Sequence, residues 1–130
     1  MKIMVVDDSS TIRFMVTKIL REMGHKEILA FESAEQALPA LSNEKPDLVL
    51  LDWNLPKMAG IDFLNIIRQD SMFNKTKVIM ATTVNDKSNI LKALKIGIQG
   101  YICKPINREV LETKIKEMEV LIRKENEASS

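Results

Sequence analysis

The sequence predicts a doubly wound α/β domain, in which helices cover both faces of a parallel sheet. Short apolar runs alternate along the chain with amphipathic stretches, and several of the runs show no polar alternation. Such runs are typical of strands buried on both faces, as in parallel sheets. The alternation of strand and helix then implies right-handed crossovers with helices on both sides. The expected strands are Ile3–Val6, Glu27–Phe31, Asp47–Leu51, Lys77–Ala81 and Gly100–Cys103.

The stretches between these runs have the 3.6-residue apolar spacing of amphipathic helices. The first, residues 12–23, is followed by Gly24 at the position of a C-terminal cap. The second begins with a capping box of Ser33 and Gln36 and contains Pro39, which should bend the helix or end it early. The other expected helices are Gly60–Gln69, Asp86–Ile96 and a last one that Asn107 caps, with the apolar stripe Leu111, Ile115, Met118 and Ile122.

Length and composition indicate one soluble domain. The chain has 130 residues, of which 45% are hydrophobic and 28% charged. We expect the domain to span residues 1–124 and the polar tail, 125–130, to fray. The single cysteine, Cys103, excludes an intramolecular disulfide and fits a reducing cytoplasm.

Charge excludes several classes of partner. A net charge of +1 gives the chain no excess of positive charge with which to bind nucleic acid or an anionic membrane. The apolar start of the chain is interrupted by Asp7 and Asp8, too early for a signal peptide or a membrane span. We therefore expect a cytoplasmic monomer that binds neither nucleic acid nor membrane.

Polar residues stand where four of the five predicted strands end. Asp7-Asp8, Asp52, Thr82-Thr83 and Lys104-Pro105 follow the first, third, fourth and fifth strands. The carboxyl ends of parallel strands form one rim, where ligands bind in such folds. Two like charges about 4 Å apart repel by about 4 kcal/mol at an effective dielectric constant near 20. One lysine cannot offset three carboxylates, whereas a divalent cation can.

The residue types at this rim favour Mg²⁺ and phosphoryl transfer. Carboxylate and carbonyl oxygens without nearby histidine or cysteine suit a hard cation, and Mg²⁺ binds one or two carboxylates together with phosphate oxygens. Lysine and threonine are natural partners for the other phosphoryl oxygens. An aspartate beside the metal can serve as the nucleophile that forms an acyl phosphate.

In order and spacing, these residues resemble the signature of bacterial response-regulator receiver domains. The matching segments are Asp7-Asp8, Leu50–Pro56, Thr82 and Lys104-Pro105, and the resemblance covers the chain from Met1 to about Arg123. It is strongest to the single-domain members that act in chemotaxis. The resemblance implies a flavodoxin-like fold with five helices and a five-stranded parallel sheet in the order 2-1-3-4-5.

The resemblance also implies a role for each site residue. Asp52 would be the phosphoacceptor. Mg²⁺ would be held by Asp8, Asp52 and the backbone carbonyl of Asn54, with Asp7 assisting through water. Thr82 and Lys104 would contact the phosphoryl group, and the Lys104–Pro105 peptide bond would be cis. Thr83 would flank the phosphoryl group, and Tyr101 would be the aromatic residue that changes rotamer on activation.

A histidine kinase would donate the phosphoryl group, and a separate output protein, possibly the flagellar switch, would bind the activated chain. Its binding surface would be the fourth helix, the fifth strand and the fifth helix. The residues at partner-facing positions are Lys87, Ile90, Leu94, Tyr101, Cys103 and Lys114.

Three residues depart from the usual pattern. Ala59 replaces an acid before Gly60, Thr83 is bulkier than the usual residue after the switch threonine, and Val84 replaces an acid. Because the last two narrow the approach of water and offer it little polar support, we expect slow autodephosphorylation.

Alternative functions fit the residues less well. A haloacid-dehalogenase-type phosphatase needs an aspartate two residues after the nucleophile, where this chain has Asn54, and usually a cap domain. A degenerate receiver would lack residues of the site, and none is lost. A non-chemotactic phosphorelay remains open. His25, the only histidine, is expected at the surface, so a phosphohistidine donor within this chain is poorly supported.

Overall fold

The structure, a computed structural model, describes residues 1–83 and 87–129. Strands and helices alternate throughout, and a short 3₁₀ turn at Ser71–Phe73 precedes the fourth strand. The strands are β1 (Ile3–Val6), β2 (Ile28–Phe31), β3 (Leu48–Asp52), β4 (Lys77–Thr82) and β5 (Gly100–Cys103). The helices are α1 (Ser10–Glu22), α2 (Ala34–Glu44), α3 (Gly60–Gln69), α4 (Lys87–Ile96) and α5 (Arg108–Ser129).

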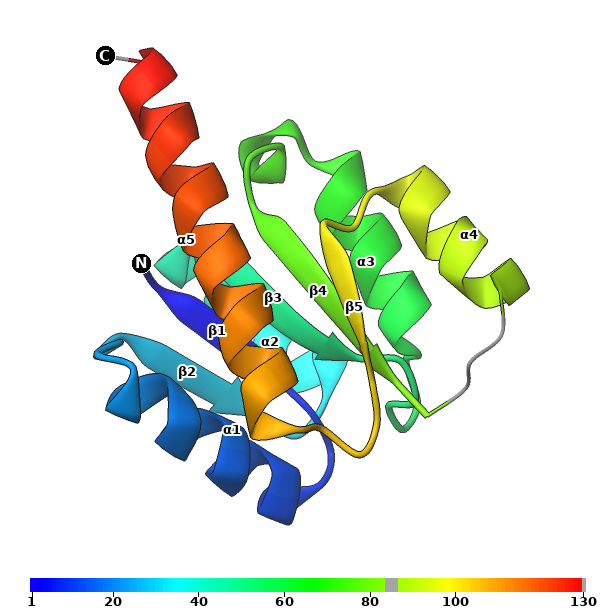
Figure 1. Cartoon of the computed structure of the whole chain (residues 1–130). Helices are drawn as coiled ribbons and strands as arrows, with labels where there is room; N and C mark the ends of the chain where they lie inside the picture. The colour runs from blue at the N-terminus through cyan, green and yellow to red at the C-terminus, as the bar shows by residue number, and fades with distance from the viewer. Residues whose placement is uncertain (84–86, 130) are drawn as a thin grey trace.

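The strands form one parallel sheet in the order β2-β1-β3-β4-β5, which confirms the predicted fold (Figure 1). Every residue of β1, β3 and β4 is buried, which explains their continuous apolar runs. The expected strand ends were correct to within one residue. In register, Asp52 lies opposite Ala81, and Thr82 opposite Cys103, so the polar strand ends share one edge.

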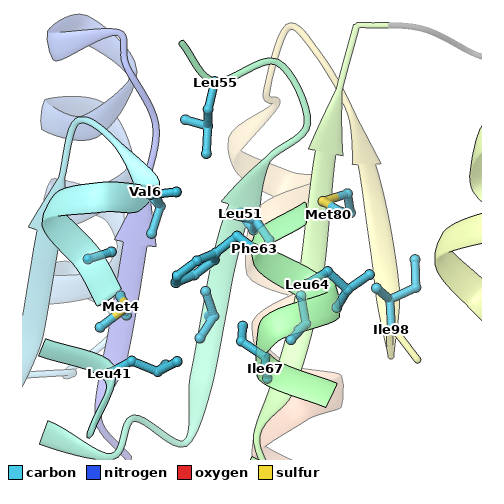
Figure 2. Close-up of a cluster of buried hydrophobic side chains, with 14 of the residues drawn as sticks. Met4, Val6, Leu41, Leu51, Leu55, Phe63, Leu64, Ile67, Met80 and Ile98 are labelled. Carbon is cyan, nitrogen blue, oxygen red and sulfur yellow. The ribbon is translucent and has the colours of Figure 1, made fainter. Parts of the chain in front are cut away.

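Helices cover both faces of the sheet (Figure 1). The apolar residues of α1 and α5 pack against one face, and those of α2, α3 and α4 pack against the other. On the second face, Phe63 lies between α3 and the strands with none of its surface exposed (Figure 2). Burying one such side chain contributes about 1.5–3 kcal/mol. Neighbours in this cluster include Met4, Val6, Leu41, Leu51, Leu64, Ile67 and Met80.

Pro39 does not end α2, and the expectation of an early end was wrong. The helix continues to Glu44. Both Pro39 and Glu35 are exposed. Water can therefore bond to the Glu35 carbonyl that loses its helical donor at Pro39, which keeps the cost of the missing bond low.

The last helix was expected to end near residue 124, and this was also wrong. α5 continues through the segment 125–129, and its C-terminal end extends beyond the sheet (Figure 1). Glu125 forms an ion pair with Lys77 at the start of β4, whose side chain is only 9% exposed. The Lys77 ammonium group lies 2.7 Å from Glu125 Oε2, so this contact fixes the first residue of the supposed tail.

His25 is less exposed than expected. Its side chain is 12% exposed, and its Nε2 lies 2.9 Å from Glu119 Oε1 on α5. The predicted start of the fourth helix at Asp86 lies outside the described residues. Within the described residues, no helix is long and apolar enough to cross a membrane.

Candidate phosphoryl-transfer site

Three acidic side chains meet at the carboxyl edge of the sheet. Asp7 and Asp8 follow β1, and Asp52 is the last residue of the neighbouring β3. One carboxylate oxygen from each of the three residues lies within 4.8 Å of the other two. Asp7 and Asp52 are both 3% exposed, whereas Asp8 is exposed. The sheet thus concentrates negative charge at one point that solvent reaches through Asp8.

Lys104, the residue after β5, joins two of these carboxylates. Its ammonium group lies 2.9 Å from Asp7 Oδ2 and 3.2 Å from Asp52 Oδ2. The backbone positions it, because Lys104 N–H donates to the Thr82 carbonyl at 2.8 Å. The Lys104–Pro105 peptide bond is cis, the isomer that the resemblance implies.

Asp7 is held by donors on both oxygens. The Ser9 N–H donates to Oδ1 at 2.9 Å, while Oδ2 faces Lys104. Arg13 Nη1 donates to the Asp7 backbone carbonyl at 2.6 Å. Ser9 is also the N-cap of α1, since its side chain accepts from the Ile12 N–H. The start of α1 therefore fixes the orientation of Asp7, and sequence reasoning missed both Ser9 and Arg13.

The pKa of Asp52 is raised above its ordinary value. Burial is the largest cause, and the charge of Asp7 adds to it. Lys104 and the Asn54 N–H, which donates to Oδ1 at 3.1 Å, act in the opposite direction. The site therefore destabilises the charged form of Asp52, and a further cation beside it would relieve this repulsion.

The pKa of Lys104 is raised as well. Burial alone would lower it, but the hydrogen bond to Asp7 and the charges of Asp52 and Asp7 outweigh burial. Lys104 is consequently a fixed positive charge at neutral pH. A fixed ammonium group beside a carboxylate can bind a phosphoryl oxygen as a point charge.

Gly60 sets the distance between α3 and the end of β3. A Cβ atom at this position would lie 2.2 Å from the Asp52 backbone oxygen and 3.0 Å from Trp53 Cα. The Gly60 N–H also donates to the Trp53 carbonyl at 3.0 Å. Only a residue without a side chain permits this contact. The sequence signal was a glycine at the start of a helix, which sequence reasoning did not connect with Asp52.

The donor set fits a magnesium ion. Three carboxylates with one half-buried lysine leave net negative charge, and the cluster offers oxygen ligands only, as Mg²⁺ prefers. The Asn54 carbonyl belongs to the loop directly after β3. Donors contact both oxygens of Asp7 and, in the same way, both oxygens of Asp52.

Thr82 and Tyr101 line one small cavity between the sheet and α4. Thr82 is 4% exposed at the end of β4, and Tyr101 is 39% exposed on β5. Trp53, half-buried beside Asp52, also lines this cavity. The other lining residues are Met80, Asn89, Ile90, Ala93 and Ile98. Thr82, at the edge that carries Asp52, and the exposed Tyr101 therefore line the same cavity.

Thr83 lies at the exposed side of the site. The Asn54 side-chain amide donates to Thr83 Oγ1 at 3.4 Å, which joins the loops after β3 and β4. Val84, the other departure from the usual pattern, lies outside the described residues.

The surface predicted for an output partner is partly apolar. Leu94 is 49% exposed, and Lys87 and Cys103 are also exposed. Ile90 and Lys114 are half-buried. Sequence reasoning missed Leu91, which is 56% exposed beside these residues on α4. The available signal was that α4 carries more large apolar residues than one buried stripe requires.

Comparisons with known proteins agree with this geometry. The family described as response regulator receiver domain matches residues 3–116. Chemotaxis protein CheY1 of Helicobacter pylori is 38% identical over 117 residues, which cover 89% of this chain and 94% of that protein. Chemotaxis protein CheY of Pseudomonas aeruginosa is 36% identical over 118 residues, with coverage of 91% and 95%. The structure of the chemotaxis response regulator CheY4 of Vibrio cholerae has a TM-score of 0.84 and 29% identity, with coverage of 90% and 97%. The chain therefore belongs to the response regulator receiver domain family.

Proposed function

We propose that this chain accepts a phosphoryl group from a histidine kinase on Asp52, with Mg²⁺ as cofactor, and then binds a separate output protein. Receiver domains take phosphate from histidine kinases and pass the signal to output partners. The observation that carries the proposal for this chain is the cluster of Asp7, Asp8 and Asp52, two of whose carboxylates contact Lys104.

In the proposed reaction, a carboxylate oxygen of Asp52 attacks the phosphorus atom of a phosphohistidine. The new P–O bond forms as the P–N bond breaks, and the released imidazole nitrogen takes up a proton. Lys104 would bind a phosphoryl oxygen, and its distance of 3.2 Å from Asp52 Oδ2 supports this role. Thr82 would supply a hydroxyl donor to another phosphoryl oxygen.

Asp8, Asp52 and the Asn54 carbonyl would hold Mg²⁺, and Asp7 would assist through water. When bound, the ion would neutralise the charge of the carboxylates and of the incoming phosphoryl group. The raised pKa of Asp52 supports this assignment, because burial and the Asp7 charge leave the carboxylate without full compensation.

Activation would alter the surface of α4, β5 and α5. Thr82 would turn toward the phosphoryl group, and Tyr101 would move into the space that Thr82 leaves. Their position around one cavity supports this mechanism. The output surface would comprise Lys87, Ile90, Leu94, Tyr101, Cys103 and Lys114, to which the exposure of Leu91 adds a further apolar residue.

The pathway we propose is control of chemotaxis or of the flagellar motor, in the cytoplasm. The support is that relatives at 38% and 36% identity over most of the chain bear the name chemotaxis protein.

Phosphoryl uptake tests the central claim. We expect acetyl phosphate with Mg²⁺ to add the mass of one phosphoryl group to the wild-type chain and none to Asp52→Asn, which lacks the nucleophile. Asp7→Asn should retain slower uptake, because Asp7 supports the site indirectly. Asp62→Asn, which alters an exposed carboxylate on α3, is the matched control and should behave as wild type.

Intact mass spectrometry of the four proteins, with and without EDTA, provides the measurement. A phosphoryl mass on Asp52→Asn, or equal uptake in the presence of EDTA, would contradict the proposal.

A further inference from the structure

Arg13, in the first turn of α1, contacts the loop between β1 and α1 at two points. Its guanidinium Nη1 donates to the Asp7 carbonyl at 2.6 Å, and its backbone N–H donates to the Ser9 carbonyl at 3.0 Å. The first bond is short, as is usual where the donor is charged. Arg13 therefore holds both the residue before Asp8 and the residue after it.

The two peptide groups that flank Asp8 both have fixed partners. The carbonyl of the Asp7–Asp8 peptide group accepts from Arg13, and the N–H of the Asp8–Ser9 peptide group donates to Asp7 Oδ1 at 2.9 Å. Asp7 is itself attached to the sheet, since its N–H donates to the Phe31 carbonyl at 3.1 Å. The backbone at Asp8 thus has a set orientation, although the residue is exposed.

This orientation matters because Asp8 is the exposed member of the acidic cluster. Asp7 and Asp52 are buried, and Lys104 contacts both of them. Asp8 lacks such surroundings, so the position of its carboxylate beside the other two depends on the direction of its backbone. Groups that orient a metal ligand from outside the coordination sphere commonly set the affinity for the metal.

The stability of α1 does not account for an arginine at this position. A positive charge near the N-terminus of a helix is unfavourable, and an acid is favoured there. The first turn of α1 contains no acid, and Ser9 already caps the helix. A positive charge on the loop that carries Asp8 also opposes the binding of a cation. The contact with the Asp7 carbonyl is a contribution that offsets both costs.

We infer that Arg13 is a positioning residue for Mg²⁺, which acts through the Asp7 carbonyl to orient the carboxylate of Asp8 beside Asp52. This inference rests on the proposed function, in which Asp8 is a ligand of the ion. It adds that the affinity for Mg²⁺ depends on a side chain of α1 that has no acceptor atom with which to bind a cation.

A titration of the intact chain with MgCl₂, followed by the NMR shifts of backbone amides near Asp52, measures the dissociation constant. We expect Arg13→Met to raise this constant about 10-fold, the lower end of the effect of losing an outer contact. Arg13→Lys should raise it less, because lysine keeps a charged donor. A purely electrostatic effect would have the opposite sign, since removing one positive charge favours the binding of another.

The matched control is Arg21→Met, which removes an exposed arginine from the last turn of the same helix. Its dissociation constant for Mg²⁺ should equal that of the wild type. The same spectra show whether each variant keeps the fold, because amides far from the loop should not shift.

The metal-free chain in EDTA reports the orientation itself. The Ser9 N–H is protected by its bond to Asp7 Oδ1. We expect its hydrogen exchange to accelerate in Arg13→Met, because the Asp7–Asp8 peptide group loses its donor, and to stay unchanged in Arg21→Met. This measurement does not depend on the metal. Unchanged exchange in Arg13→Met would overturn the inference.

The Asp8→Asn variant tests whether Arg13 acts through Asp8. We expect this substitution to weaken Mg²⁺ binding, and the addition of Arg13→Met to weaken it little further, because both changes affect the same ligand. An equal loss from Arg13→Met in the two backgrounds would overturn the inference, since Arg13 would then act independently of Asp8.

The outcomes separate this inference from the proposed function. Asp8→Asn that binds Mg²⁺ as tightly as the wild type would overturn the proposed metal site, and the inference with it. Weaker binding in Asp8→Asn, together with unchanged or tighter binding in Arg13→Met, would overturn the inference alone. If Arg13→Met does not fold, Arg13→Lys carries the comparison, and its smaller loss should disappear in the Asp8→Asn background.

Discussion

Asp52 combines burial with proximity to a second carboxylate, so its charge opposes folding. Its pKa in the folded chain is raised above its ordinary value, first by burial and then by the charge of Asp7. A carboxyl group whose pKa rises on folding destabilises the folded state once it ionises. This destabilisation is absent at pH values below the pKa of Asp52 in the unfolded chain. It grows as the pH rises towards the pKa of Asp52 in the folded chain, and it is complete above that pKa.

We therefore predict that Asp52→Asn stabilises the metal-free chain at pH 7, by on the order of 1 kcal/mol. The gain should shrink as the pH approaches 3.8, where the wild-type carboxyl becomes protonated in both states. Urea unfolding of both proteins in EDTA across this pH range provides the measurement. A free-energy difference that does not vary with pH would show that the substitution acts through packing and not through charge.

Thr83 is expected to affect a different property at the residue scale, the lifetime of the proposed phosphorylated state. Its hydroxyl accepts a hydrogen bond from the Asn54 side chain at 3.4 Å on the exposed side of the site. We predict that Thr83→Ala accelerates loss of phosphate, because it removes this bridge and widens the approach of water. Val84→Glu should also accelerate it, by supplying polar support. Decay of the phosphorylated mass after removal of acetyl phosphate measures the rate, and equal half-lives would refute the prediction.

At the scale of elements, Gly60 determines how closely α3 approaches β3. Gly60→Ala would place Cβ 2.2 Å from the Asp52 backbone oxygen, which cannot move without displacing Asp52, the proposed phosphoacceptor. We predict a destabilisation of about 1–3 kcal/mol, the usual cost of overpacking, together with slower phosphoryl uptake. The matched control is Gly100→Ala, whose Cβ would meet its neighbours only at 3.7 and 3.8 Å. Unfolding curves and uptake rates that match between the two variants would show that α3 can adjust without consequence.

The sequence predicted the strands well because burial on both faces leaves a continuous apolar run. It also predicted that Asp7, Asp52 and Lys104 share one edge, since parallel strands bring their carboxyl ends together. The end of α5 was missed because the stabilising contact, Lys77 with Glu125, joins residues 48 positions apart. The polar composition of residues 125–129 does not reveal a contact with a residue so far away in the sequence. The segment was therefore predicted to be a frayed tail, although it is helical.

Arg68 was missed for a similar reason. Arg68 lies near the end of α3, and three of its four hydrogen-bond partners are the backbone carbonyls of Phe73, Thr76 and Gly97, whose positions depend on the completed fold. An arginine near the end of a helix is an ordinary helix-dipole residue when read from the sequence alone. Every residue has a backbone carbonyl, so a contact to one cannot be recognised from the residue types in the sequence. Aspartates and lysines at the ends of strands can be recognised in this way.

At the scale of the whole molecule, the proposed phosphorylation and partner binding would be coupled over a short distance. Asp52 and Thr82 lie at the same edge of the sheet, and the cavity beside Thr82 reaches Tyr101 on the proposed output surface. One hydrogen bond from Thr82 to a charged group contributes about 1.5–3 kcal/mol. Shifting a population from 1:99 to 99:1 requires about 5.5 kcal/mol. In the proposed mechanism, Thr82 alone therefore could not complete the switch, and Lys104, the metal and the partner would have to contribute the remainder.

We accordingly predict that the phosphorylated chain alone remains a mixture of two states, and that the output partner and the phosphoryl mimic strengthen each other's binding. The affinity for a partner recovered from lysate with beryllofluoride-treated protein should rise about 5- to 150-fold when beryllofluoride and Mg²⁺ are added. Linkage requires the partner to tighten beryllofluoride binding by the same factor.

Tyr101→Ala should lose most of this gain in affinity, whereas Phe14→Ala, which removes an aromatic side chain that is 70% exposed on α1, should retain it. Titration calorimetry in both directions measures the two factors. Equal affinities with and without beryllofluoride would show that the surface of α4, β5 and α5 does not carry the output.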